Sequence, residues 1–110
     1  MVPGFPNFFI MYGPNTNGGL TISNFEHEAD FIVAQITRVL RRGATSVEAR
    51  GRAVDLCNRW VQHRISSTAW VAGQNYFSSA SGRNVTQWPE GAALYALGLL
   101  ALRRLGTRVT

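Results

Sequence analysis

The sequence predicts an α+β fold in which a short strand and an aromatic β-hairpin combine with three helices. Three observations carry this prediction: an apolar run at residues 8–12, apolar residues at helical spacing in two separate stretches, and a nearly uncharged run of helix length before the end. The 110 residues and 12.1 kDa are the size of one domain. We therefore treat residues 1–110 as a single segment.

The first predicted unit is a strand, a glycine-rich loop and a helix. Residues 8–12 (FFIMY) have strand length and no alternation, which is typical of a strand buried on both faces. Residues 13–19 are dense in turn formers. Ser23 and Glu26 have the spacing of a capping box, and Gly43 is a helix stop, so a helix is predicted between them. Its apolar positions recur at helical spacing: Ala29, Ile32, Val33, Ile36 and Leu40.

Two more helices and a hairpin are predicted after Gly43. Residues 45–48 (TSVE) form a second capping-box pattern, which predicts the start of an amphipathic helix. Residues 68–88 mix large aromatics with Ser, Gly and Asn, which favours a hairpin turning at residues 81–82. A last helix is predicted from Glu90 to about Leu105; because it is apolar nearly all round, we expect it to be buried against another surface. The apolar stripe predicted for the amphipathic helix is Ala49, Ala53, Leu56, Cys57, Trp60 and Ile65.

The charge is positive and unevenly distributed. All eleven basic residues are arginines, set against six acidic residues, and every arginine lies in residues 36–110. Such a basic half can attract phosphate groups, as in nucleic-acid binding, which would weaken steeply with salt. The arginines are scattered instead of lining one helix face, so we expect a solvated surface and no nucleic-acid partner. No continuous apolar run reaches the ~20 residues of a membrane span, so none is predicted.

Few side chains suggest independent chemistry. Cys57 has no second cysteine to pair with, and the N-terminal residues lack a basic signal-peptide region, so we expect a reducing, cytoplasmic location. His27 and His63 lie in different predicted helices without a neighbouring ligand set, so no metal site is predicted. Cys57 lies on an apolar stripe, which is typical of a core residue and not of a nucleophile. No catalytic residue is predicted.

The loop before the first helix is the best candidate for ligand binding. A helix N-terminus presents unpaired N–H groups and a partial positive charge, and Gly18 and Gly19 would allow a ligand to approach the backbone closely. The alternative is a plain strand-to-helix connection, because the order of residues matches no phosphate-binding motif. The aromatic tract 70–88 leaves a similar choice between stacking a planar ligand and filling a core.

Two tracts resemble one known family. Residues 4–17 (GFPNFFIMYGPNTN) resemble the C-terminal flavin-contacting strand and loop of flavin-dependent monooxygenases of the Baeyer–Villiger type. Residues 76–84 (YFSSASGRN) and 88–90 (WPE) resemble the late Trp-Tyr…Gly-Arg…Trp-Pro-Gly tract of the same family. Both matches occur in the family's order with a similar helical interval. The resemblance covers residues 4 to about 95.

The resemblance implies a C-terminal part of an FAD-binding domain in an enzyme with two dinucleotide-binding domains. Such an enzyme holds FAD, takes hydride from NADPH and inserts one oxygen atom into a ketone or similar small organic substrate. Tyr76 stands where the family has a tryptophan beside the nicotinamide and the substrate cleft. The residues implied at the flavin's pyrimidine edge are Gly13, Pro14 and Asn15 of the loop and Thr21, Ile22 and Ser23 at the helix start.

Most of that enzyme's motifs are absent from these 110 residues. No GxGxxG sequence and no FxGxxxHxxxW signature occurs, so the resemblance implies that the remainder of the enzyme, or a companion chain, supplies them. The isolated chain is therefore expected to be inactive and to bind FAD weakly. The alternative is a small helical interaction module without catalytic activity. It would bury its apolar last helix against a partner, and that partner can be a second copy of the chain.

Overall fold

Three α-helices and a two-stranded sheet make up the part of the chain that the structure describes, residues 1–18, 21–71 and 76–110 of a computed structural model. The sheet and helices confirm a small α+β unit. Along the chain the elements are α1 (Thr21–Arg41), β1 (Val47–Ala49), α2 (Gly51–Ile65), the short 3₁₀ helix η1 (Ala69–Val71), α3 (Ala92–Leu105) and β2 (Thr107–Val109).

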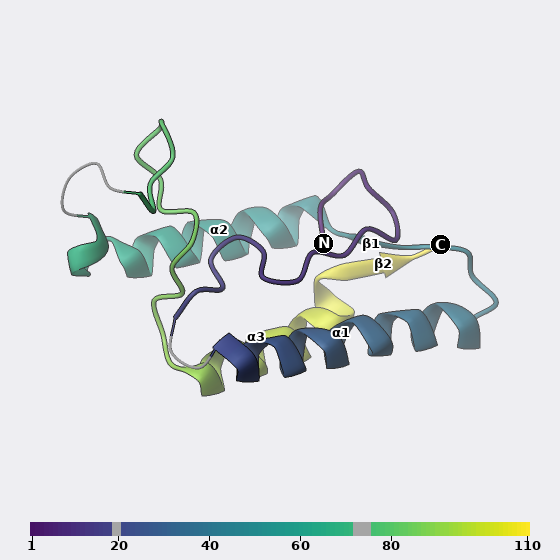
Figure 1. Cartoon of the computed structure of the whole chain (residues 1–110). Helices are drawn as coiled ribbons and strands as arrows, with labels where there is room; N and C mark the ends of the chain where they lie inside the picture. Colours follow the sequence, from purple (N-terminus) through teal and green to yellow (C-terminus); the bar gives the residue numbers. More distant parts are fainter. Residues whose placement is uncertain (19–20, 72–75) are drawn as a thin grey trace.

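The helices form two layers with the N-terminal segment between them. Figure 1 shows α1 and α3 side by side, α2 on the other side of the purple N-terminal trace, and β1–β2 at one end. The two strands are antiparallel, with Glu48 opposite Arg108. The molecule measures 49 × 26 × 19 Å, which is elongated for its length. None of the helices within the described ranges is long and apolar enough to cross a membrane.

Helix α1 turns its predicted apolar stripe away from the rest of the chain. The helix ends at Arg41, and Gly43 has a φ of 59°, so the predicted stop is confirmed. Its buried residues are instead polar: Asn24, Glu28 and Gln35. The apolar positions are mostly excluded from this inner face, because polar side chains there form hydrogen bonds to α3 and to the N-terminal loop. Ala29, Val33, Ile36 and Leu40 are exposed.

Two local predictions near the N-terminus are wrong. Residues 8–12 are not a strand: Asn7 and Tyr12 have positive φ values of 60° and 52°, which break extended geometry at both ends. Phe8 and Met11 are also about half exposed, so the double burial is absent. Ser23 is not the N-cap either, because α1 begins at Thr21 and places Ser23 inside its first turn.

The second predicted capping box is a strand. Residues 47–49 pair with residues 107–109, and the Glu48 carboxylate accepts hydrogen bonds from Arg108 instead of reaching back toward Thr45. A long-range partner that the local pattern does not contain has thus overridden it. Helix α2 begins at Gly51, and the side chain of the N-cap residue Arg50 does not cap the helix but donates to the Thr107 carbonyl at 3.0 Å. Its C-terminal end at Ile65 agrees with the predicted stripe.

The last helix agrees with its predicted limits but not with its expected burial, since Leu94, Leu97, Leu100 and Leu105 are exposed. Among the described residues, the predicted hairpin is present as one isolated bridge. Helix α3 spans Ala92–Leu105, close to the predicted limits. Ser78 and Asn84 form an antiparallel bridge around a turn in which Gly82 has a φ of 77°. Residues 72–75 of the predicted aromatic tract lie outside the described residues. The strand that follows α3 was not predicted, since its three residues carry no pattern of their own.

Candidate functional site

The loop after residue 12 is fastened to the late aromatic tract. The Asn15 N–H donates to the Val85 carbonyl at 3.0 Å, and the Asn17 N–H donates to the Thr86 carbonyl at 2.8 Å. The Trp88 N–H donates back to the Asn17 carbonyl at 2.8 Å, which completes a short parallel ladder. The two tracts that carry the family resemblance are thus brought into direct contact.

Asn15 is the central residue of this junction. It is 7% exposed and has a φ of 56°, a conformation that asparagine tolerates better than most residues. Its side-chain Nδ2 donates to the carbonyls of Asn84 at 3.1 Å and Gln87 at 2.9 Å, partners that lie 69 and 72 positions away in sequence. The Asn15 amide therefore holds the late tract in place and has its donors committed there.

Asn84 and Gly18 complete the junction. The Asn84 Oδ1 accepts from the backbone N–H groups of Thr86 and Gln87, and its carbonyl accepts from Gln62 of α2 at 2.7 Å. A Cβ at Gly18 would lie 3.0 Å from the Trp88 carbonyl oxygen, so a larger residue would push the two tracts apart. The sequence reasoning did not identify Asn84 as part of this site.

Glu28 connects the loop with two helices. Its Oε2 accepts from the Tyr12 N–H at 2.9 Å, and its Oε1 accepts from the Tyr95 hydroxyl of α3 at 2.5 Å. Burial, followed by the hydrogen bond to Glu28, raises the pKa of Tyr95 far above its usual value. Sequence reasoning also missed Glu28 in this role; the available signal was the helical spacing of Asn24, Glu28 and Gln35, which marks a polar inner face.

Glu28 and the loop border a cavity of about 400 Å³ between the N-terminal segment and the three helices. Its lining is mainly apolar, with the Glu28 carboxylate and the Tyr95 phenol as buried polar groups. Of the predicted contacts, Gly13 and Pro14 line this cavity, together with Thr16. The other lining residues include Phe9, Ile10, Phe31, Ile32, Val54, Cys57, Leu99 and Leu102.

The remaining predicted contacts are placed differently. Thr21, Ile22 and Ser23 form the first turn of α1, and Ile22 is 77% exposed; none of the three lines the cavity. The loop reaches this turn through Asn24, whose Nδ2 donates to the Thr16 carbonyl at 3.1 Å. Tyr76 is 93% exposed, and its ring contacts Phe77 edge-on. Of the predicted contacts, the structure thus places Gly13 and Pro14 at the cavity, while Asn15, residues 21–23 and Tyr76 do not line it.

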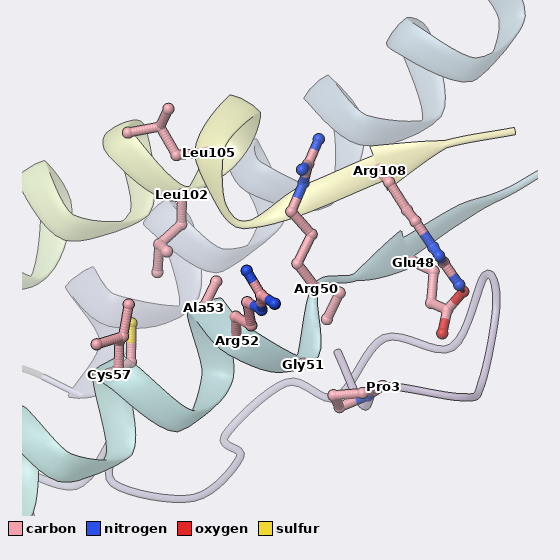
Figure 2. Close-up of a pocket in the computed structure, with 12 residues that line it drawn as sticks. Pro3, Glu48, Arg50, Gly51, Arg52, Ala53, Cys57, Leu102, Leu105 and Arg108 are labelled. Carbon is pink, nitrogen blue, oxygen red and sulfur yellow. Dashed lines mark hydrogen bonds and ion pairs between the residues drawn. The ribbon is translucent and has the colours of Figure 1, made fainter.

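A second cavity, of about 570 Å³, lies between the start of α2 and the end of α3 (Figure 2). Its lining includes Arg50, Arg52 and Arg108. Arg108 pairs with Glu48 at 2.8 Å, and the pKa of Glu48 is lowered first by this hydrogen bond and then by the N–H of Gly4. Sequence reasoning placed no site here.

Cys57 borders both cavities. Burial raises the pKa of its thiol, so at neutral pH it stays protonated and is a poor nucleophile. This chemistry agrees with the structural reading of Cys57 from the sequence. Among the residues that the structure describes, no three His, Cys, Asp or Glu side chains are grouped to hold a metal ion.

Comparisons with known proteins identify relatives for most of the chain. A Baeyer–Villiger monooxygenase of Streptomyces coelicolor is 35% identical over 78% of this chain, and one of Pseudomonas aeruginosa is 30% identical over the same share. The chain spans only 18% and 17% of the length of these two relatives. No family model matches the chain.

The fold has a counterpart among solved structures. An oxidised steroid monooxygenase bound to NADP matches 98% of this chain with a TM-score of 0.85 and 20% identity, and the match covers 22% of that protein. The backbone described here therefore occurs as one part of a larger folded chain. These findings confirm the resemblance: the sequence is similar to one segment of proteins named Baeyer–Villiger monooxygenase, and the fold recurs in one segment of a larger chain.

Proposed function

Because the chain is homologous to a segment of the Baeyer–Villiger monooxygenases, we propose that it supplies the C-terminal part of an FAD- and NADPH-dependent monooxygenase that inserts one oxygen atom into a ketone or a similar organic substrate. The observation that carries this proposal is the ladder joining residues 15–17 to residues 85–88 beside the 400 Å³ cavity. The two tracts matched from sequence form one physical unit, as a shared ligand-facing role requires.

The residues present fit one edge of a flavin and not the whole cofactor. Gly13 and Thr16 place loop backbone at a mainly apolar cavity, which suits a flat ring with a polar edge. The pyrophosphate-binding GxGxxG sequence is absent, so FAD's other half must be held by the remainder of the enzyme. When bound and reduced by NADPH, the flavin supplies the oxygen-transfer chemistry of the family.

In this proposal the residues of the chain bind one edge of the flavin and orient it. The loop at Gly13 and Pro14 faces the flavin's pyrimidine edge at the cavity. The first turn of α1 at residues 21–23 does not line this cavity and is proposed to complete that edge in the assembled enzyme, where N–H groups and the helix dipole favour negative charge. Asn15 acts by holding the late tract against this loop, and Glu28 fixes the loop backbone at Tyr12. Tyr76 is proposed to meet the nicotinamide side only in the assembled enzyme.

The test replaces the homologous segment of the Streptomyces coelicolor relative with this chain and measures NADPH oxidation with and without a ketone panel. We expect ketone-dependent NADPH oxidation by this chimera and none by the isolated chain. A chimera that is folded by circular dichroism but shows no ketone-dependent oxidation would contradict the proposal. Sub-micromolar FAD binding with NADPH oxidation by the isolated chain would overturn the expectation that it is inactive alone.

A further inference from the structure

Helix α1 turns a polar face toward the rest of the chain and an apolar face toward solvent. Its inner face is polar and satisfied: Glu28 bonds Tyr12 and Tyr95, and Gln35 donates to the Arg103 carbonyl at 2.9 Å. Its outer face carries an apolar stripe at helical spacing, with Ile22 at 77%, Val33 at 62%, Ile36 at 46% and Leu40 at 72% exposure. We call these four residues, with Ala29, the α1 outer stripe.

Helix α3 repeats this pattern. Its inner face supplies Tyr95, which is 7% exposed, while Leu94, Leu97, Leu100 and Leu105 are between 42% and 75% exposed. A surface helix of a finished domain turns its apolar stripe inward. Exposed stripes on two adjacent helices therefore mark a surface that is covered by something else.

We infer that the α1 outer stripe and the exposed leucines of α3 dock against the remaining part of the monooxygenase fold, the part of the relatives that this chain does not span. This inference rests on the proposed function. Two coverage values favour that occupant: the chain spans 18% of its Streptomyces coelicolor relative, and its backbone recurs as 22% of a larger solved chain. The surface that complements these exposed apolar side chains is an apolar surface of that larger fold.

Charge supports the same choice over a second copy of this chain. The chain carries a net charge of +5, with arginines in the last turns of both helices: Arg38 and Arg41 in α1, and Arg103 and Arg104 in α3. Two copies docked through these faces in the same direction would bring like charges together at the helix ends.

Thiol accessibility tests the docking. In a Cys57→Ser background, single cysteines are placed at Val33 and Leu97 on the apolar faces and at exposed Asp30 as the control, and each is labelled with a thiol reagent. In the isolated chain all three should react rapidly. In the chimera with the Streptomyces coelicolor relative, labelling at positions 33 and 97 should slow about tenfold or more, while position 30 changes less than about twofold.

Equal reactivity at all three positions of the folded chimera would overturn the inference, as would equal protection of all three. Protection that rises with concentration in the isolated chain would assign the surface to a second copy and overturn it as well. If the chimera does not fold, the cysteines are placed at the aligned positions of the intact relative.

FAD binding is measured in the same samples. Thiol protection without FAD binding refutes the flavin proposal alone, and FAD binding with reactive thiols refutes the docking alone.

Discussion

Asn15 shows how one residue can join parts of a chain that are far apart in sequence. Its positive φ turns the loop, and its side-chain amide binds two carbonyls of the late tract. The sequence pointed to Asn15 as a ligand contact, and that role remains a proposal. Its structural role was not predictable, because nothing local indicates that carbonyls about seventy positions away lie within reach.

Replacing Asn15 should therefore destabilise the chain. Asn15→Ala removes two buried hydrogen bonds and places alanine at positive φ, which we expect to lower the free energy of unfolding by about 2–3 kcal/mol. Asn15→Gly relieves the backbone cost and should recover about 1 kcal/mol of that loss. Urea unfolding of the three proteins measures both values. Equal unfolding midpoints for the parent and Asn15→Ala would contradict the role given to this amide.

Tyr95 makes stability depend on pH in the alkaline range. The folded-state pKa of Tyr95 lies above its ordinary value of 10, because burial and then the Glu28 carboxylate disfavour the phenolate. Above pH 10 the unfolded chain loses this proton while the folded chain keeps it, so stability falls as pH rises. Below that pH the group has no effect on the slope.

We expect the unfolding midpoint to fall as the pH rises above about 10, and to fall less in Tyr95→Phe, which has no proton to lose. Glu28→Gln should lie between these two proteins, since it removes the carboxylate but leaves the phenol buried. Urea unfolding at several pH values measures the slopes. A Tyr95→Phe variant with the same alkaline slope as the parent would contradict this account.

The elements divide into those fixed by local sequence and those fixed by distant partners. Helix α3 and the stop of α1 at Gly43 follow from local patterns and were predicted. Strand β1 was predicted as a helix start, because the segment that pairs with it lies some sixty positions further on. The apolar spacing of α1 correctly predicted a helix. The sequence alone does not say which face of that helix the rest of the chain packs against.

Two glycines of the α3 region allow a matched test of packing. Gly98 lies inside the helix, and a Cβ there meets nothing within 4 Å; Gly98→Ala should stabilise the chain by about 0.5–1 kcal/mol through helix propensity. A Cβ at Gly106 would lie 2.7 Å from the Leu102 Cδ2 and 3.0 Å from its carbonyl oxygen. Gly106→Ala should therefore destabilise the chain by about 1–2 kcal/mol. Thermal unfolding distinguishes the two variants. Shifts of the melting temperature in the same direction for both would refute the packing at this turn.

At the scale of the whole molecule, the chain buries little apolar surface. Among the described residues only Val47, Ala49, Val61, Ile65 and Tyr95 form the buried hydrophobic set, while many large apolar side chains are exposed. The radius of gyration is 14.6 Å, against about 13 Å for a compact chain of this length. Both quantities are those expected of a segment whose apolar faces belong to a larger core.

This deficit should be visible in the heat capacity of unfolding. A compact chain of this size gives a value of about 1.3–1.6 kcal/mol/K, which is set mainly by newly exposed apolar surface. Because much of that surface is exposed in the folded chain, we expect a clearly smaller value for the isolated protein. Differential scanning calorimetry measures it, and a value at or above that range would show that the apolar faces are buried in solution.

The measurement that tests the central claim most directly is the FAD dissociation constant of the chimera, with and without Asn15→Ala. We expect the chimera to bind FAD and Asn15→Ala to weaken binding about tenfold, equivalent to ~1.4 kcal/mol, at a temperature where both proteins are folded. Ala80→Ser at the exposed hairpin turn is the control and should leave the constant unchanged. A folded chimera that binds no FAD, or one in which Asn15→Ala and Ala80→Ser bind it equally well, would contradict the account.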